Sequence, residues 1–327
     1  MEQPQSVAEG LPPAACRLPP VVEVERLVKR YRGAPHNAVD SISFGVGAGE
    51  FFALLGPNGA GKTTTISILT TTLAPTAGRV FIAGVDVRRD PAAVRRQIGI
   101  IFQNPSLDMN LSGEENVRLH AILYGLYPYR PAYRLMPAAY RRHIADMAAV
   151  LAMESDMFRP VRTLSGGMRR KLEIIRGLMH RPRVLFLDEP TAGLDAASRR
   201  SLWAYLAEIR QRQETTIVLT THYLEEAEAA DRILILNHGQ VLAQGSPGDI
   251  KAQRGGESLE IDAADRDALR RELKRLDVRF DENAHFLIYL DSRSAYDLVR
   301  VLTTPLTVMR TRQASLEDVY LRILAHD

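Results

Sequence analysis

The stretch FFALLGPNGAGKTTT, residues 51–65, constrains the fold of this chain more than any other. Five apolar residues, Phe51–Leu55, run directly into a glycine cluster, which is typical of a strand buried on both faces. The following residues place Ile66, Leu69 and Leu73 on one helical face. A strand, a glycine-rich loop and a helix in this order give the GxxxxGK[ST] pattern the context of a phosphate-binding loop.

Physical chemistry explains why such a loop binds an anion. Its glycines let backbone N–H groups converge without obstruction from Cβ atoms, and the helix N-terminus adds partial positive charge. Lys62 can reach the β- and γ-phosphates, and the Thr63 hydroxyl can ligate Mg²⁺. A glycine-rich turn with a solvated lysine is the alternative, but the strand and helix around the loop disfavour it. We therefore expect nucleotide binding.

Composition narrows the class of protein. A length of 327 residues fits two domains, and 46% hydrophobic with 25% charged residues is ordinary for a globular protein. The formal charge of +3 gives no case for nucleic acid as a partner. Cys16 is the single cysteine, which excludes an internal disulfide and suits a reducing cytoplasm.

Two features of the chain bear on membranes. Residues 1–20 carry five prolines and no periodicity, and we interpret them as a disordered tail. No apolar run approaches the roughly 18 residues needed to span a bilayer. Any membrane role is therefore expected to require a partner.

The pattern after residue 20 predicts an α/β protein. Residues 21–31 and 38–46 alternate as an antiparallel pair, 79–87 and 98–103 are further strands, and 98–103 ends on Gln103. A capping box at Ser112 opens a mostly helical insertion at about 104–165. Its segment 124–134 is rich in tyrosine and arginine, which suits either an interface or a half-exposed helical linker. The sequence alone favours neither.

Further candidate groups follow the insertion. Ser165-Gly166-Gly167 opens a helix and offers a second set of backbone donors to an anion. The basic run 169–171 after it is interpreted as a solvated helix face. The predicted buried strand 184–190 carries two carboxylates at its carboxyl edge: Asp188, suited to Mg²⁺, and Glu189, suited to polarising water. The predicted buried strand 215–222 ends in His222, which falls at the same edge.

The last third of the chain predicts a separate unit. Residues 232–246 form a hairpin turning at 237–239, and a hinge follows at 253–258. Beyond it the order βαββαβ plus a final helix predicts a small α+β, ferredoxin-like domain. We place the nucleotide-binding domain at 21–250 and the accessory domain at 256–327.

The ordered set of motifs over about 21–250 resembles the nucleotide-binding subunit of ABC transporters: the phosphate loop, a glutamine after a strand, LSGG, LDEP, GLD and a histidine after a strand. The resemblance implies a P-loop ATPase core with an antiparallel β subdomain, and ATP with Mg²⁺ as ligands. It also implies a dimer in which each ATP lies between the loop of one subunit and the signature of the other.

The resemblance assigns roles to individual residues. Tyr31 would stack on adenine, and Gln103 would sit near Mg²⁺ and the attacking water. Asp188 would support the metal, Glu189 the water, His222 the γ-phosphate and Asp195 the cross-dimer contact. Ser165, Gly166 and Gly167 would reach the γ-phosphate of the opposite subunit's nucleotide. The phosphate-holding residues would be Gly56, Pro57, Asn58, Gly59, Ala60, Gly61, Lys62, Thr63 and Thr64.

One departure and one alternative accompany the resemblance. Met168 stands where the family most often has glutamine, and GGM before basic residues, with the SLEDVYL ending, is similar to the drug- and lipid-export branch of the daunorubicin-resistance type. That branch implies a separate membrane permease and a cytoplasmic location on the inner face of the cell membrane. A soluble ABC ATPase without a permease is the alternative. A small GTPase is disfavoured, because no NKxD-like segment is present.

Overall fold

The computed structural model describes residues 20–102, 106–192, 194–254, 257–290, 295–313 and 315–325. The predicted tail at 1–20, apart from Pro20, lies outside them, and so does Gln103. No helix within these ranges is long and apolar enough to cross a membrane.

A six-stranded sheet in the order β10-β9-β3-β8-β7-β6 forms the centre of the first part of the chain. Five of its strands are parallel and β10 is antiparallel at the edge. The predicted strand 51–55 is confirmed as β3, and the strand predicted over 184–190 is confirmed as β7, which ends earlier, at Asp188. All residues of β3 and β7 are buried. The bounds are β3 Phe51–Leu55, β6 Ile98–Ile101, β7 Val184–Asp188, β8 Thr216–Thr221, β9 Arg232–Asn237 and β10 Gln240–Gly245.

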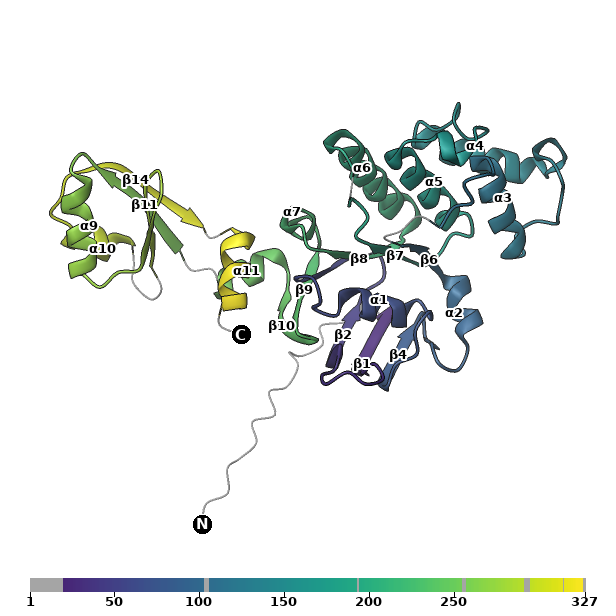
Figure 1. The fold of residues 1–327 in the computed structure, drawn as a ribbon. Coiled ribbons are helices and arrows are strands. Elements are labelled where there is room, and N and C mark those ends of the chain that lie inside the picture. Colours follow the sequence, from purple (N-terminus) through teal and green to yellow (C-terminus); the bar gives the residue numbers. More distant parts are fainter. Residues whose placement is uncertain are drawn as a thin grey trace, which may run out of the picture.

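The two faces of this sheet carry different cores. Phe51, Ala53 and Leu55 face helices, whereas Phe52 and Leu54 face a second, antiparallel sheet. Figure 1 shows α3 to α6 on one side, with α1 and the antiparallel strands on the other. The helices are α1 Lys62–Leu69, α2 Pro91–Gln97, α3 Gly113–Leu123, α4 Ala138–Val150, α5 Gly166–Leu178, α6 Ala196–Gln213, α7 Leu224–Glu228 and α8 Pro247–Arg254, with short 3₁₀ turns at Tyr133–Leu135 and Val161–Thr163.

The antiparallel sheet has the order β2-β1-β4-β5, with β1 Val22–Lys29, β2 Val39–Val46, β4 Ala77–Ile82 and β5 Val85–Asp86. The single strand expected over 79–87 is wrong: β4 and β5 form a tight hairpin in which Ile82 pairs with Val85. Ala83 and Gly84 both adopt left-handed φ angles of 50° and 80°. Two such residues in succession suit a two-residue hairpin turn.

The small domain has the predicted βαββαβ order, and its sheet order β12-β13-β11-β14 is fully antiparallel, as in a ferredoxin-like fold. Its elements are β11 Glu257–Ala263, α9 Arg266–Arg275, β12 Phe280–Glu282, β13 Phe286–Tyr289, α10 Ala295–Val301 and β14 Leu306–Gln313. The final helix, α11 Leu316–Ala325, leaves this domain. Its Leu316 and Val319 are buried in the same core as Ile250 of α8. Figure 1 shows α11 apart from the strands and helices of the small domain.

Candidate active site

The phosphate-loop segment joins β3 to α1 between two stretches of backbone. A Cβ atom on Gly56 would lie 2.3 Å from the Leu236 carbonyl oxygen. Gly61, the N-cap of α1, has φ 103°, and a Cβ there would lie 2.5 Å from the Ala38 carbonyl oxygen. Both positions therefore require glycine, and the loop is held in shape by its surroundings.

Lys62 is buried at the start of α1 and points back over the loop. Its ammonium donates to the carbonyl oxygens of Gly56 at 2.7 Å and Pro57 at 2.9 Å. Burial lowers its pKa, and the nearby carboxylates of Glu189 and Asp188 oppose that shift. The ammonium is thus kept in a desolvated place, where a phosphate oxygen would be a stronger partner than a neutral carbonyl.

The carboxylates predicted at the sheet edge lie beside the loop. Asp188 Oδ1 accepts a hydrogen bond of 2.5 Å from Thr220 Oγ1 and a long one of 3.4 Å from Thr63 Oγ1. Because β8 lies between β3 and β7, the loop threonine, the Asp188 carboxylate and the end of β8 meet at one edge. Thr63 and Asp188 supply the hard oxygen atoms that Mg²⁺ prefers, so they fit that ion.

Glu189 and His222 form a pair at the same edge. Glu189 adopts a left-handed φ of 47°, and its N–H donates to the Thr220 carbonyl oxygen at 3.1 Å. The turn brings Glu189 Oε1 to 3.3 Å from His222 Nδ1, with the two side chains 12% and 37% exposed. A carboxylate beside an imidazole, in the neighbourhood of Lys62 and Asp188, can take up a proton from water.

Tyr31 also reaches the loop from the other sheet. It follows the end of β1 rather than closing the strand, and it is 46% exposed. Its hydroxyl lies 3.3 Å from Thr64 Oγ1, and the ammonium of Lys29 lies 5.5 Å from its ring centroid. An exposed ring beside the loop suits stacking against a nucleotide base.

The signature segment lies next to the first turn of α6, at whose start Asp195 stands. Ser165 caps α5 and Asp195 caps α6. A Cβ atom on Gly167 would lie 2.7 Å from Ser198 Oγ, which itself donates to Asp195. Among the described residues, no hydrogen bond or ion pair joins Ser165 or Asp195 to the phosphate loop.

Arg170 is a buried residue of the site region, and its assignment to a solvated helix face is wrong. The side chain is 6% exposed and donates to the carbonyl oxygens of Phe102 at 2.5 Å and Pro190 at 2.9 Å. It also pairs with Glu173 at 3.0 Å. It therefore ties the start of α5 to the segments that follow β6 and β7. Nothing in the basic run of the sequence distinguishes it from its neighbours.

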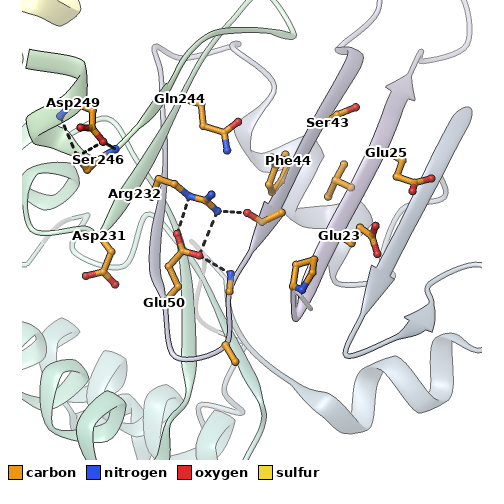
Figure 2. A pocket seen from close by; sticks show the side chains of 15 residues that line it. Glu23, Glu25, Ser43, Phe44, Glu50, Asp231, Arg232, Gln244, Ser246 and Asp249 are labelled. Atoms are coloured by element: carbon orange, nitrogen blue, oxygen red, sulfur yellow. Dashed lines mark hydrogen bonds and ion pairs between the residues drawn. The ribbon is translucent and has the colours of Figure 1, made fainter. Parts of the chain in front are cut away.

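A cavity of about 890 Å³ lies away from these groups, between the antiparallel sheet and β9–β10 (Figure 2). Its lining includes Glu23, Glu25 and Asp249, and Glu50, which pairs with Arg232 at 2.8 Å. None of its lining residues belongs to the predicted site.

Comparison with known proteins agrees with this geometry. The family model described as ABC transporter matches residues 39–192. The doxorubicin resistance ATP-binding protein DrrA of Mycobacterium tuberculosis (strain ATCC 25618 / H37Rv) is 42% identical over 252 residues, which cover 76% of this chain and 73% of that protein. The chain belongs to the ABC transporter ATP-binding proteins. It is an ATPase of the branch that contains the drug-resistance exporters, as its motifs predict.

Other relatives extend the match to the accessory domain and the fold. The Nod factor export ATP-binding protein I of Ralstonia nicotianae (strain ATCC BAA-1114 / GMI1000) is 35% identical over 317 residues, 94% of this chain and 95% of that protein. A structure described as an ATP binding subunit of an ABC transporter matches with a TM-score of 0.63 at 32% identity, over 72% of this chain and 93% of that chain. The ATP-binding cassette MJ0796 bound to ADP and Pi, a dimer after hydrolysis, matches with a TM-score of 0.61 at 27% identity, over 69% of this chain and 98% of that one.

Proposed function

We propose that two copies of this chain close around two ATP molecules and drive a separate permease that exports a substrate. Each ATP would lie between the phosphate loop of one copy and the Ser165–Gly167 signature of the other. Two observations support this arrangement: both segments present helix N-termini suited to an anion, and, among the described residues of one chain, no hydrogen bond or ion pair joins them. The matched cassette MJ0796 is itself a dimer in its post-hydrolysis state.

Within each site, the residues would divide the chemistry. Tyr31 would stack on the base, residues 56–64 would cradle the phosphates, and Thr63 with Asp188 would hold Mg²⁺, which neutralises phosphate charge when bound. Glu189 would accept the proton of the attacking water, and His222 would orient Glu189 and contact the γ-phosphate. Asp195 would act across the dimer. Gln103, assigned to the metal and the water, lies outside the described residues.

The observation that carries the assignment is the Glu189–His222 contact of 3.3 Å beside Lys62 and Asp188. Glu189→Gln should lower kcat about 10²–10⁴-fold, because the amide cannot take the proton of water. ATP binding should persist and an ATP-bound dimer should accumulate, measured by ATPase assay and by size-exclusion chromatography with ATP. Glu154→Gln, the same change at an exposed position, is the control. Turnover within a few-fold of the wild type would contradict the role of Glu189.

The permease contact is proposed on the helical insertion. The aromatic segment 124–134 divides in the structure: Tyr127 and Tyr133 pack against buried Tyr140, whereas Tyr129 is 64% exposed. Leu119, Leu123 and Leu126 are exposed large apolar side chains of the same region, and Leu123 is 84% exposed. Exposed apolar side chains with aromatic and arginine neighbours are typical of an interface. We infer that a cytoplasmic segment of the permease covers this patch and holds the ATPase on the inner face of the membrane.

A double change tests the docking surface. Tyr129→Ala with Arg130→Ala should leave basal ATPase activity and folding intact but abolish recruitment to membranes that contain the permease, since truncations at interface hot spots cost about 2 kcal/mol or more. The matched control is Tyr296→Ala with Arg300→Ala, an exposed tyrosine–arginine pair on the accessory domain. Normal sedimentation of the first variant with these membranes would contradict the docking proposal.

A further inference from the structure

The imidazole of His222 has a second neighbour besides Glu189. The ring of Tyr223 lies with its centroid 4.0 Å from the His222 ring, tilted by 39°. The guanidinium carbon of Arg199 lies 5.2 Å from the centroid of the Tyr223 ring. Arg199, Tyr223 and His222 therefore form a continuous stack, which we call the histidine stack. It ends at Glu189.

Arg199 belongs to the first turn of α6, directly after the segment that carries Asp195. Its N–H donates to the Asp195 carbonyl oxygen at 3.0 Å. Its Nε atom is buried and has no hydrogen-bond partner among the described residues. The guanidinium is also near enough to the buried Glu226 carboxylate to favour its charged form. A cation over a tyrosine ring in a partly buried place is an attractive contact.

Tyr223 is held by its backbone. Its N–H donates to Thr221 Oγ1 at 2.9 Å, and that hydroxyl donates to Glu226 Oε2 at 2.6 Å. Glu226 is buried and also accepts from the hydroxyl of Thr191, two residues after Glu189. One buried carboxylate thus connects the segment after Glu189 with the segment before His222. These hydrogen bonds hold the backbone of Tyr223, and with it the position from which its ring contacts the imidazole.

His222 itself needs such support. Its side chain is 37% exposed, and an imidazole at the end of a strand can rotate about two side-chain bonds. A ring packed on one face restricts that rotation. A misplacement of about 1 Å in a catalytic group can cost 10²-fold in rate, so restricting the rotation of the His222 ring should have a measurable effect on the rate of hydrolysis.

We propose that Tyr223 and Arg199 are positioning residues that hold the His222 imidazole against Glu189. The inference rests on the proposed role of His222 in hydrolysis. Ser198, on the same turn of α6 as Arg199, lies so close to Gly167 of the signature that a Cβ atom there would come within 2.7 Å of its Oγ. The histidine stack therefore begins on the turn that lies next to the signature segment.

The test compares ring-deleting and ring-keeping variants by ATPase kinetics. Tyr223→Leu and Arg199→Met should lower kcat about ten- to a hundredfold, with KM for ATP and the thermal unfolding midpoint near wild-type values. Tyr223→Phe should keep most of kcat, because it retains the ring that touches His222. A loss in Tyr223→Phe equal to that in Tyr223→Leu would overturn the proposal, since the hydroxyl and not the ring would then matter.

A double-mutant cycle separates positioning from general structure. In a His222→Ala background, Tyr223→Leu should change the rate less than about twofold, because the group it positions is gone. Single-turnover hydrolysis with enzyme in excess measures these slow rates. Losses that multiply in the double variant would overturn the proposal. If His222→Ala is inactive but Tyr223→Leu hydrolyses ATP normally, the positioning role of Tyr223 is refuted while the role of His222 in hydrolysis stands. A wild-type rate in His222→Ala would remove the role of His222 and the inference together.

Discussion

Lys62 carries its charge where burial disfavours that charge, so its proposed role in phosphate binding would come at a cost in stability. Its pKa is lowered by desolvation, which means that the folded state binds the proton less tightly than the unfolded state. This penalty is fully present below the folded pKa and disappears as pH rises towards the ordinary lysine value of about 10.4. On the proposed role of Lys62, the nucleotide-free protein would be less stable because it keeps this ammonium buried for a phosphate.

Removing the charge tests this trade-off. Lys62→Met should abolish the rise in melting temperature that ATP causes, because the phosphate contact is lost. Without nucleotide, it should melt no lower than the wild type at neutral pH. As pH rises through the folded pKa, the wild type should gain stability relative to the variant. Differential scanning fluorimetry at several pH values measures this. A nucleotide-free variant that melts well below the wild type at neutral pH would show that the charge stabilises the loop.

At the scale of elements, the last helix, α11, packs against the nucleotide-binding core and, within the described residues, not against the small domain that precedes it. Leu316→Ala should lower the free energy of unfolding by about 2–5 kcal/mol, because Leu316 is 1% exposed and its loss leaves a cavity. Trp203, the single tryptophan, packs against Phe51 in that core. Urea unfolding followed by tryptophan fluorescence therefore reports on the nucleotide-binding core and not on the small domain. Leu321→Ala on the exposed face of α11 is the control and should shift stability by less than about 0.5 kcal/mol. If the unfolding transition reported by Trp203 were unchanged in Leu316→Ala, α11 would not contribute to the stability of this core.

Some elements can be predicted from sequence because their signals are local. The run FFALL is apolar throughout, and VLFLD is apolar up to its last residue, Asp188, so both β3 and β7 are recognised without knowledge of their neighbours. The sequence predicts the β4–β5 hairpin as one strand because alanine at the turn rarely adopts a left-handed φ and gives no turn signal. The burial of Arg170 cannot be predicted from the sequence, for a different reason. It depends on carbonyl oxygens of Phe102 and Pro190, which only the folded chain brings to α5.

At the scale of the whole molecule, the predicted site residues of one chain fall into two groups. The phosphate loop, Asp188, Glu189 and His222 meet at one sheet edge, and these positions follow from parallel strands whose carboxyl ends coincide. Ser165 and Asp195 stand elsewhere, at the start of α5 and of α6. A single sequence cannot show which surface a signature faces in an assembly. The proposed domain bounds, 21–250 and 256–327, likewise stay a prediction.

A mixed dimer tests whether each site is built from two chains. Ser165→Arg places a bulky cation where the signature would meet the partner's nucleotide, and Lys62→Ala removes the phosphate contact. Each homodimer of these variants would hold two defective sites. A heterodimer would pair the intact loop of the Ser165→Arg chain with the intact signature of the Lys62→Ala chain, giving one complete site. Mixing the two inactive proteins should therefore restore ATP hydrolysis, up to the amount expected for the heterodimer fraction, measured with differently tagged chains purified together. Rates in the tagged heterodimer equal to those of both parents would contradict the shared site, and the isolated Lys62→Ala homodimer serves as the baseline.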